Sequence, residues 1–395
     1  MNTVAQQRGP AKIFLIAAEE SGDRLGQDLM KALRAELGGA VTFSGVGGRS
    51  MNSEGLMSLF TVDDLSIVGF AEIPRRLPLI LRRIREASLT VLRERPDVLV
   101  IIDSPDFTHR VARRVRSQDP SIPIVDYVSP TVWAWRTGRA RAMCAYIDRV
   151  LALLPFEPEA YRRLGGPPCD YVGHPLLEHI GSLTPLTAEA AARATGTPQL
   201  LVLPGSRRSE IRRHIDIFGE TLAQLRASGV SFDAVLPTLP HLENKVREAV
   251  KAWPVAPRIV VGEDERRAAY RNARAALAKS GTVTLELALA RVPMVAAYKV
   301  SAWEAAIARR VIATNTVILA NLVIGENVVP EFLQNDCRPD RLALALHEIL
   351  GEGPSRQRQL DAFSRLRDIM STGDRAPSQR AADLIIAAMR QPRRK

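Results

Sequence analysis

The chain has 395 residues, 46% of them hydrophobic and 25% charged, which is typical of a globular protein and excludes a disordered or fibrous one. The chain is longer than those that usually fold around a single hydrophobic core, so two domains are expected. No apolar run is long enough to span a membrane. The net charge of +11 favours an anionic partner, and a simple preference for arginine is the alternative explanation. Aromatic residues make up 5% of the chain, which disfavours stacking on nucleic acid, and the three scattered cysteines predict neither disulfides nor a metal site.

The first half of the chain alternates apolar runs with amphipathic segments, which is typical of a doubly wound parallel sheet. Helices are predicted near residues 20–37 and 75–95. The predicted strands cover residues 12–18, 41–46, 98–102, 122–128 and 149–154.

A second series of the same kind follows residues 181–198, whose Ser, Thr and Pro content predicts a linker. One helix is predicted near residues 215–227, and a polar helical tail begins near residue 338. The predicted strands cover residues 200–203, 232–236, 259–261, 275–278 and 294–298. We therefore expect an N-terminal lobe over 12–180, a C-terminal lobe over 198–340 and a helical tail over 341–395.

The turn after the strand 200–203 has the features of an anion site. Gly205 permits a close approach of the backbone, and Ser206 and Arg207 add donors at the start of a helix. An ordinary turn with solvated arginines explains the same residues.

A similar turn follows the strand 275–278. Ser280, Gly281 and Thr282 offer hydroxyl and backbone donors, and Glu286 lies one helical turn further on, where a carboxylate can bind a ribose diol. A solvated or capping acid is the alternative for Glu286. Two such turns in one lobe suit a diphosphate that is flanked by a nucleoside.

Asp103 follows the apolar strand 98–102 and is a candidate general base toward a hydroxyl. The alternative role for Asp103 is to cap the following helix. Glu19 and Asp23 in the first loop have the same two interpretations, a functional acid or a helix cap. No His or Cys pair has metal-ligand spacing, so no metal is predicted. A P-loop and a nucleophile elbow are also absent from the sequence.

The segment 75–95 predicts a basic amphipathic helix, which suits an anionic membrane surface. A core helix with a solvated basic face is the alternative. The candidate membrane-facing residues are Leu77, Ile80, Leu81, Ile84, Arg82, Arg83 and Arg85.

Several motifs together resemble the lipid-A-disaccharide synthase family of GT-B glycosyltransferases, in order from about residue 12 to 335. The most specific is the Ser-Pro-x-Val-Trp-Ala-Trp run at 129–135. The others are Ser21-Gly22-Asp23, Gly45-Val46-Gly47-Gly48, Asp103-Ser104-Pro105-Asp106-Phe107, Leu154-Pro155-Phe156-Glu157, Gly173-His174-Pro175, Leu203-Pro204-Gly205-Ser206-Arg207, Ser280-Gly281-Thr282 with Leu285-Glu286, and Asn321-Leu322.

The resemblance implies two Rossmann-like lobes facing one cleft, with the nucleotide held mainly by the C-terminal lobe. It implies an inverting transfer from UDP-2,3-diacylglucosamine to 2,3-diacylglucosamine 1-phosphate at the inner face of the Gram-negative inner membrane, without metal, cofactor or nucleic acid. Asp103 would be the base for the acceptor 6-hydroxyl, and Arg207 would stabilise the departing diphosphate. Donor binding falls to Gly205, Ser206, Ser280, Gly281, Thr282 and Glu286, while Glu19, Ser21, Asp23 and Asn321 line the cleft without an assigned role.

Three other interpretations stay open at this point. One is a different GT-B transferase for another UDP-sugar and lipid acceptor, and another is a non-hydrolysing UDP-sugar epimerase of the same architecture. A basic nucleic-acid or membrane adaptor is the third, but it leaves Asp103 and the paired turns unexplained. The tail beyond Arg338 has two places to pack, on the first lobe of its own chain or on a second copy in a homodimer.

Overall fold

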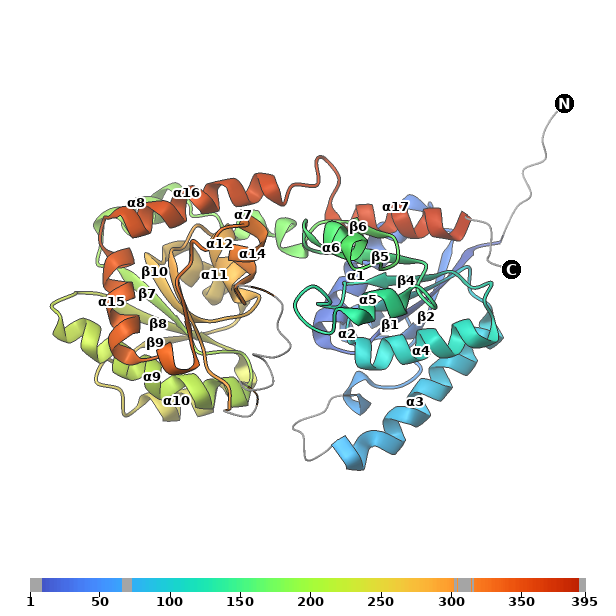
Figure 1. The fold of residues 1–395 in the computed structure, drawn as a ribbon, viewed down its shortest axis with the longest axis horizontal. Coiled ribbons are helices and arrows are strands. Elements are labelled where there is room, and N and C mark those ends of the chain that lie inside the picture. The colour runs from blue at the N-terminus through green and yellow to red at the C-terminus, as the bar shows by residue number, and fades with distance from the viewer. Residues whose placement is uncertain (1–8, 66–72, 302–303, 305–313, 315, 391–395) are drawn as a thin grey trace. The chain divides into compact units, whose positions relative to one another are not determined.

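Two six-stranded sheets, in which every registered pair is parallel, organise the chain (Figure 1). The computed structural model describes residues 9–65, 73–301, 304, 314 and 316–390. Each sheet belongs to one of two units. Unit 1 comprises Met1–Leu177 and Thr372–Lys395, and unit 2 comprises Glu178–Ser371.

The sheet of unit 1 has the strand order β2-β1-β3-β4-β5-β6. Its order reverses between β1 and β3, and ligands of open parallel sheets bind at such a reversal, outside the carboxyl ends of the strands. The strands are β1 (Ala11–Ala17), β2 (Val41–Val46), β3 (Val98–Ile102), β4 (Ile124–Tyr127), β5 (Arg149–Ala152) and β6 (Cys169–Tyr171).

Helices cover both faces of this sheet because alternate strand residues are apolar on both sides. Phe14 and Ile16 pack in one buried cluster with residues of α3 and α4, whereas Ile13 and Leu15 pack in another with residues of α1 and α17. The helices of unit 1 are α1 (Glu20–Glu36), α2 (Arg49–Ser53), α3 (Ile73–Glu94), α4 (Pro105–Gln118), α5 (Gly138–Met143), α6 (Glu157–Arg163) and α17 (Pro377–Arg390), with 3-10 turns at Val62–Asp64 and Pro175–Leu177.

The sheet of unit 2 has the strand order β12-β11-β10-β7-β8-β9 and reverses between β7 and β10. Its strands are β7 (Gln199–Leu203), β8 (Asp233–Thr238), β9 (Arg258–Val261), β10 (Ala275–Lys279), β11 (Met294–Tyr298) and β12 (Glu331–Leu333). Its helices are α7 (Ile180–Leu183), α8 (Thr187–Thr195), α9 (Arg208–Ala227), α10 (Glu243–Val250), α11 (Glu263–Asn272), α12 (Val283–Leu289), α14 (Leu319–Ile324), α15 (Pro339–Leu350) and α16 (Pro354–Ile369), with 3-10 turns at Pro240–Leu242 and Gln334–Asp336.

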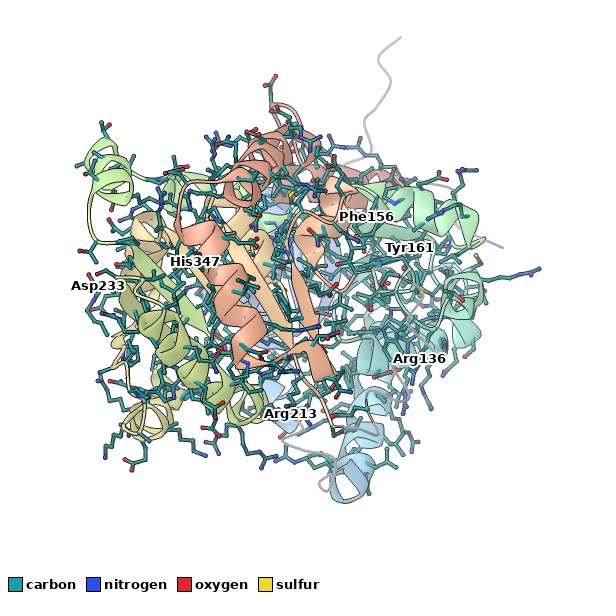
Figure 2. The ribbon with its side chains drawn as sticks, turned by 60° about the vertical axis from the view of Figure 1, so that its left-hand side comes forward. Arg136, Phe156, Tyr161, Arg213, Asp233 and His347 are labelled. Carbon is teal, nitrogen blue, oxygen red and sulfur yellow. The ribbon has the colours of Figure 1, made fainter. Side chains whose placement is uncertain are left out.

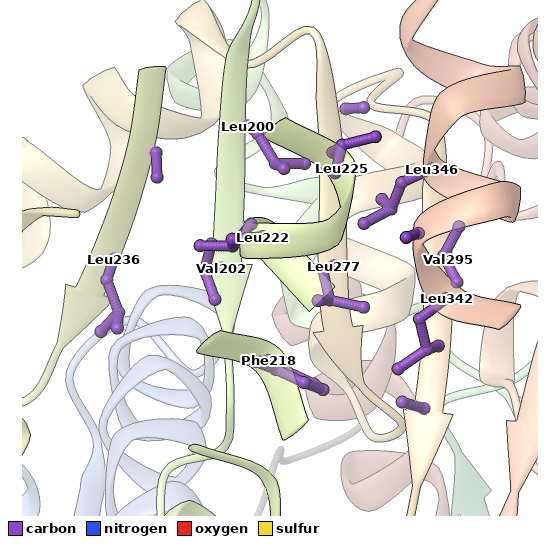
Figure 3. Close-up of a cluster of buried hydrophobic side chains, with 14 of the residues drawn as sticks. Leu200, Val202, Phe218, Leu222, Leu225, Leu236, Leu277, Val295, Leu342 and Leu346 are labelled. Atoms are coloured by element: carbon purple, nitrogen blue, oxygen red, sulfur yellow. The ribbon is translucent and has the colours of Figure 1, made fainter. Parts of the chain in front are cut away.

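A buried cluster holds α9 and α15 against one face of the second sheet (Figure 3). Leu200, Val202 and Leu277 of the strands meet Phe218 of α9 and Leu346 of α15, and all five are fully buried. Each such side chain stabilises the fold by about 1.5–3 kcal/mol relative to an exposed one. The strand ends beside this cluster are therefore rigid, and they carry the turns considered below.

The predicted doubly wound parallel architecture is confirmed. The helix start predicted at Ser206 and Arg207 and the helix predicted near 215–227 belong to one helix, α9, which begins at Arg208. The segment 181–198, predicted as a linker, contains α7 and α8. Two short strands, β6 and β12, were not predicted.

Candidate active site

Asp103 lies directly after β3, at the point where the strand order of unit 1 reverses. Asp103 and Ser104 have φ angles of 54° and 47°, a left-handed backbone that costs non-glycine residues about 1–3 kcal/mol each. The Thr108 hydroxyl braces this turn by donating to the Asp103 carbonyl at 2.7 Å. Backbone strain of this kind is retained where the surrounding structure holds a functional side chain in place.

The Asp103 carboxylate is partly exposed and has few partners. Its Oδ1 accepts the Ser104 N–H at 2.7 Å, and its Oδ2 accepts the Ser21 hydroxyl at 3.4 Å. Glu19 and Ser21 are exposed at the carboxyl end of the adjacent strand β1. The structure therefore brings Ser21 and Asp103 together at the carboxyl ends of β1 and β3, where a partly exposed carboxylate is a candidate base toward a hydroxyl group.

Asp23, in contrast, is 4% exposed and holds another segment of the protein. Its carboxylate accepts backbone N–H groups of Gly48 at 2.6 Å, Ser50 at 2.8 Å and Met51 at 3.1 Å. These are the orphan donors at the start of α2. A Cβ at residue 48 would lie 2.7 Å from Asp23 Oδ2, which explains the glycine there. Asp23 thus anchors the loop after β2.

In unit 2, a pocket of about 330 Å³ lies at the reversal point between β7 and β10. It contains every predicted donor-binding residue except Ser280, together with basic and acidic side chains from α9, α11 and β10. Its lining residues include Gly205, Ser206, Arg207, Glu210, Arg266, Tyr270, Lys279, Gly281, Thr282 and Glu286.

The Glu210 carboxylate accepts the hydrogen-bond donors of the turn that follows β7. Its Oε2 accepts the backbone N–H groups of Ser206 at 3.0 Å and Arg207 at 3.3 Å, and its Oε1 accepts the Arg207 guanidinium at 3.3 Å. Gly205 has a φ of +130°, and a Cβ there would lie 2.6 Å from the Cβ of Glu210. Close packing of Glu210 therefore already requires glycine at residue 205. The Arg207 side chain remains 74% exposed and extends from a fixed turn.

Lys279, the last residue of β10, pairs with Glu210 at 3.0 Å and lies 5.2 Å from the centre of the Tyr298 ring. Burial raises the pKa of Glu210, but Lys279 and the backbone N–H of Ser206 outweigh it, so the pKa lies below its usual range. Glu210 and Lys279 are pocket residues that the sequence analysis missed. A Glu three residues after a helix cap is a recognisable capping-box signal, whereas a lysine that ends an apolar strand is a weaker one.

Glu286 is 17% exposed and accepts a hydrogen bond from Arg266 at 3.0 Å. Burial raises the pKa of Glu286, and Arg266 opposes that rise. Arg266 in turn lies 5.7 Å from the Tyr270 ring. Arg266 and Tyr270 were also missed, since only the fold places α11 beside α12.

Ser280 and Asn321 are buried and bind the protein's own backbone. The Ser280 hydroxyl donates to the Val317 carbonyl at 3.0 Å. The Asn321 amide accepts from the N–H groups of Val328 and Val329 and donates to the Val329 carbonyl at 3.0 Å. In this conformation both side chains hold neighbouring segments, and Thr282 is the exposed hydroxyl of the second turn.

The basic helix α3 has two distinct faces. Ile84 packs in the core with 6% exposure and Ile80 against it, while Leu77 and Leu81 are 41% and 50% exposed. Of the three candidate arginines, Arg82 and Arg85 are exposed. Arg83 instead bonds to Asp64 at 2.6 Å and Glu86 at 2.7 Å, and covers the Phe60 ring. Leucines and arginines thus share the outer face of α3.

The described residues contain neither a candidate membrane span nor a candidate metal site. None of their helices combines the length and hydrophobicity of a membrane span. No group of three or more His, Cys, Asp or Glu side chains among them is arranged to hold a metal ion.

Comparisons with known proteins cover nearly the whole chain. The family model described as lipid-A-disaccharide synthetase matches residues 13–385. The curated lipid-A-disaccharide synthase of Bradyrhizobium diazoefficiens is 64% identical over 390 residues, which cover 98% of this chain and 100% of the relative.

Solved structures resemble the chain at much lower identity. Acinetobacter baumannii MurG has a TM-score of 0.58 and 15% identity, covering 96% of this chain and 100% of MurG. The UDP complex of S. aureus MnaA has a TM-score of 0.62 and 12% identity, covering 95% of this chain and 96% of MnaA. Such low identity shows a shared fold alone.

Proposed function

Because the chain belongs to the lipid-A-disaccharide synthase family, we propose that it condenses UDP-2,3-diacylglucosamine with 2,3-diacylglucosamine 1-phosphate to give lipid A disaccharide 1-phosphate and UDP. Its fold is the GT-B fold of two Rossmann-like units. Another GT-B transferase and a UDP-sugar epimerase are not favoured, because the 64% identity is to a synthase and extends over nearly the whole chain.

The single observation that supports the assigned roles is that a candidate base lies at one strand-order reversal and an anion-binding pocket at the other. In unit 1 that point holds a partly exposed carboxylate on a strained backbone, and in unit 2 it holds a pocket lined by Arg207, Arg266 and Lys279. Ligands of open parallel sheets bind at such points. A base and an anion-binding pocket are the two parts that an inverting sugar transfer from a nucleoside diphosphate needs.

The pocket of unit 2 suits the UDP part of the donor. Glu286 accepts the hydroxyls of the ribose, and Thr282 donates to the phosphates. Arg207 and Lys279 neutralise the charge that develops on the diphosphate as it departs, in a pocket where charges interact more strongly than in water. These cations make a divalent metal unnecessary in the proposed mechanism.

Asp103 acts as the general base. Its Oδ2 accepts the proton of the acceptor 6-hydroxyl while that oxygen forms a bond to C1 of the donor sugar. The bond between C1 and the UDP oxygen breaks in the same displacement, so an α-linked donor gives a β-linked product. Ser21, at 3.4 Å from Oδ2, keeps the carboxylate oriented before the acceptor arrives.

The reaction is tested by following UDP release from the donor with and without the acylated sugar 1-phosphate. Release that depends on the acceptor, with a disaccharide phosphate as the co-product, is the expected result. Release without acceptor, or conversion of the donor to an epimer, contradicts the proposal. Activity is expected to survive EDTA, because Arg207 and Lys279 supply the positive charge that a metal ion would otherwise provide.

The outer face of α3 is proposed to bind an anionic membrane surface at the inner face of the inner membrane. Leu77 and Leu81 supply exposed apolar area, and Arg82 and Arg85 attract lipid head groups. Arg83 contributes less, because its guanidinium is already held by two carboxylates.

Vesicle flotation distinguishes this face from an ordinary solvated one. Each basic residue near an anionic surface contributes about 1 kcal/mol, so Arg82→Glu with Arg85→Glu lowers binding to phosphatidylglycerol vesicles at least about 30-fold. The matched control reverses Arg358 and Arg367, two exposed arginines of α16. Equal binding of both double variants contradicts the proposal.

A further inference from the structure

The loop of residues 129–136 follows β4 and contains the Ser-Pro-x-Val-Trp-Ala-Trp run, and a buried carboxylate holds it. Glu157, the first residue of α6, is 3% exposed. Its Oε1 accepts the indole N–H of Trp133 at 3.0 Å, and its Oε2 accepts the backbone N–H of Leu154 at 2.9 Å. One side chain thus joins the loop after β4 to the turn after β5.

Aromatic packing reinforces this link. The Trp133 ring meets Phe156 edge to face, with centroids 5.0 Å apart at 85°. The Ser129 hydroxyl lies 3.2 Å from the Tyr161 hydroxyl, so the start of the loop is also held by α6. Figure 2 labels Phe156, Tyr161 and Arg136 in this part of unit 1.

The loop borders the turn that carries Asp103. The Asp103 N–H donates to the carbonyl of Tyr127, the last residue of β4, at 3.1 Å. Arg139, just after the loop, pairs with Asp106 at 3.2 Å. The position of the loop and the position of the Asp103 turn are therefore coupled at both ends of the loop.

The outer part of the loop presents groups that suit a sugar phosphate. Trp135 is 40% exposed, and its indole N–H donates to the Thr131 hydroxyl at 2.9 Å. The Arg136 guanidinium lies 4.3 Å from the centre of the Trp135 ring. An aromatic face packs against a sugar ring, and a guanidinium binds a phosphate.

We propose that Glu157 is a positioning residue, whose ionised carboxylate holds the 129–136 loop in the shape that binds the acceptor sugar phosphate beside Asp103. This inference rests on the proposed function for the identity of the acceptor. Glu157 itself touches no substrate and acts through Trp133.

The environment of Glu157 makes this link sensitive to pH. Burial raises the pKa of Glu157 to about 7, against the hydrogen bonds from Leu154, Trp133 and Ser129. The ionisable groups that face it are Tyr161 on its own helix and Cys169 and Tyr171 on β6, with Asp126 of β4 and Arg380 of α17 acting on these neighbours. None of these three groups carries a positive charge.

The direction of the pH effect follows from the two hydrogen bonds. Above pH 7 the carboxylate accepts both the Trp133 and the Leu154 N–H groups. Below it, a proton on one oxygen opposes one of the two donors, and the loop loosens. The Glu157→Gln side chain has the same defect at every pH, since its NH₂ group must face one of the two N–H donors.

The test is a pH titration of tryptophan fluorescence on the full chain. The wild type is expected to show a transition centred near pH 7, which Glu157→Gln and Trp133→Phe both remove. Glu159→Gln is the matched control, because this exposed glutamate of the same helix pairs only with solvated arginines. A transition that persists in Glu157→Gln, or its absence from the wild type, overturns the proposal.

Kinetics separate the proposal from a general loss of structure. Glu157→Gln and Trp133→Phe are each expected to lower kcat/KM for the acceptor about 10- to 100-fold, with UDP affinity unchanged, because a misplaced binding loop costs about this much. The double variant is expected to lose no more than either single variant. Additive losses, or an equal loss of UDP affinity, overturn the positioning role, whereas a lack of any sugar transfer by the wild type contradicts the proposed function instead.

Discussion

Lys279 offers a quantitative test of the donor pocket, because the sequence motifs did not assign it a role. Its ammonium group pairs with Glu210 at 3.0 Å, and only 14% and 13% of the two side chains are exposed. In Lys279→Met the pocket loses a cation, and the Glu210 carboxylate loses its strongest opposite charge.

Removing one partner of a buried pair costs about 3–5 kcal/mol, and partial exposure reduces this to about 2–3 kcal/mol for the stability of unit 2. The UDP diphosphate loses a charge contact worth about 2 kcal/mol, which corresponds to a roughly 30-fold higher Kd. Isothermal titration with UDP and urea denaturation measure the two effects on the same samples.

Lys251→Met is the control, since Lys251 is 70% exposed and pairs with an exposed Glu248. Exposed pairs contribute about 0–1 kcal/mol, so neither quantity changes measurably in this variant. If Lys279→Met binds UDP within about twofold of the wild type, Lys279 does not face the diphosphate and the proposed mechanism loses its second cation.

Three further predictions concern residues whose contacts are structural. Gly205→Ala places a Cβ 2.6 Å from that of Glu210 at a φ of +130°, and it is expected to destabilise unit 2 by about 2 kcal/mol or more in urea denaturation and to weaken UDP binding. Asp23→Asn sets an NH₂ group against backbone N–H donors and is expected to cost unit 1 about 3 kcal/mol, and an unchanged midpoint would show that the three hydrogen bonds contribute nothing. Asn321→Ala removes the amide that bonds to the backbone of Val328 and Val329 and leaves the buried Val329 groups without this partner, so a loss of about 3 kcal/mol is expected in urea denaturation, with normal UDP affinity of the folded protein.

The fold was largely predictable because buried parallel strands are continuous apolar runs. Residues 41–46, 98–102 and 294–298 were predicted to the residue, and the last two strands have a neighbour on each side in their sheets. The edge strands β6 (Cys169–Tyr171) and β12 (Glu331–Leu333) have three residues each and are only partly buried, so they carry no such signal. The helix start predicted at Ser206 and Arg207 and the helix predicted near 215–227 were not recognised as one helix, because the polar first turn that Glu210 caps lacks apolar periodicity.

The candidate site was predictable to the level of strand ends. Asp103, Arg207 and Glu286 were selected because each follows a strand, and the topology places them at the reversal points. The partners of each side chain could not be predicted, since they depend on which loops meet in space. Asp23 and Asn321 have the polar character of site residues, yet their contacts are with backbone N–H and carbonyl groups.

The central claim is that Asp103 is the base of a sugar transfer whose donor is held by the pocket of unit 2. The most direct measurement compares single-turnover rates of acceptor-dependent UDP release for wild type and Asp103→Asn, with UDP affinity measured on both proteins. A rate loss of at least about 1,000-fold at unchanged UDP affinity is expected, because the variant keeps the shape of the turn and loses the proton acceptor. A rate within about tenfold of the wild type would contradict the assignment of Asp103 as the base.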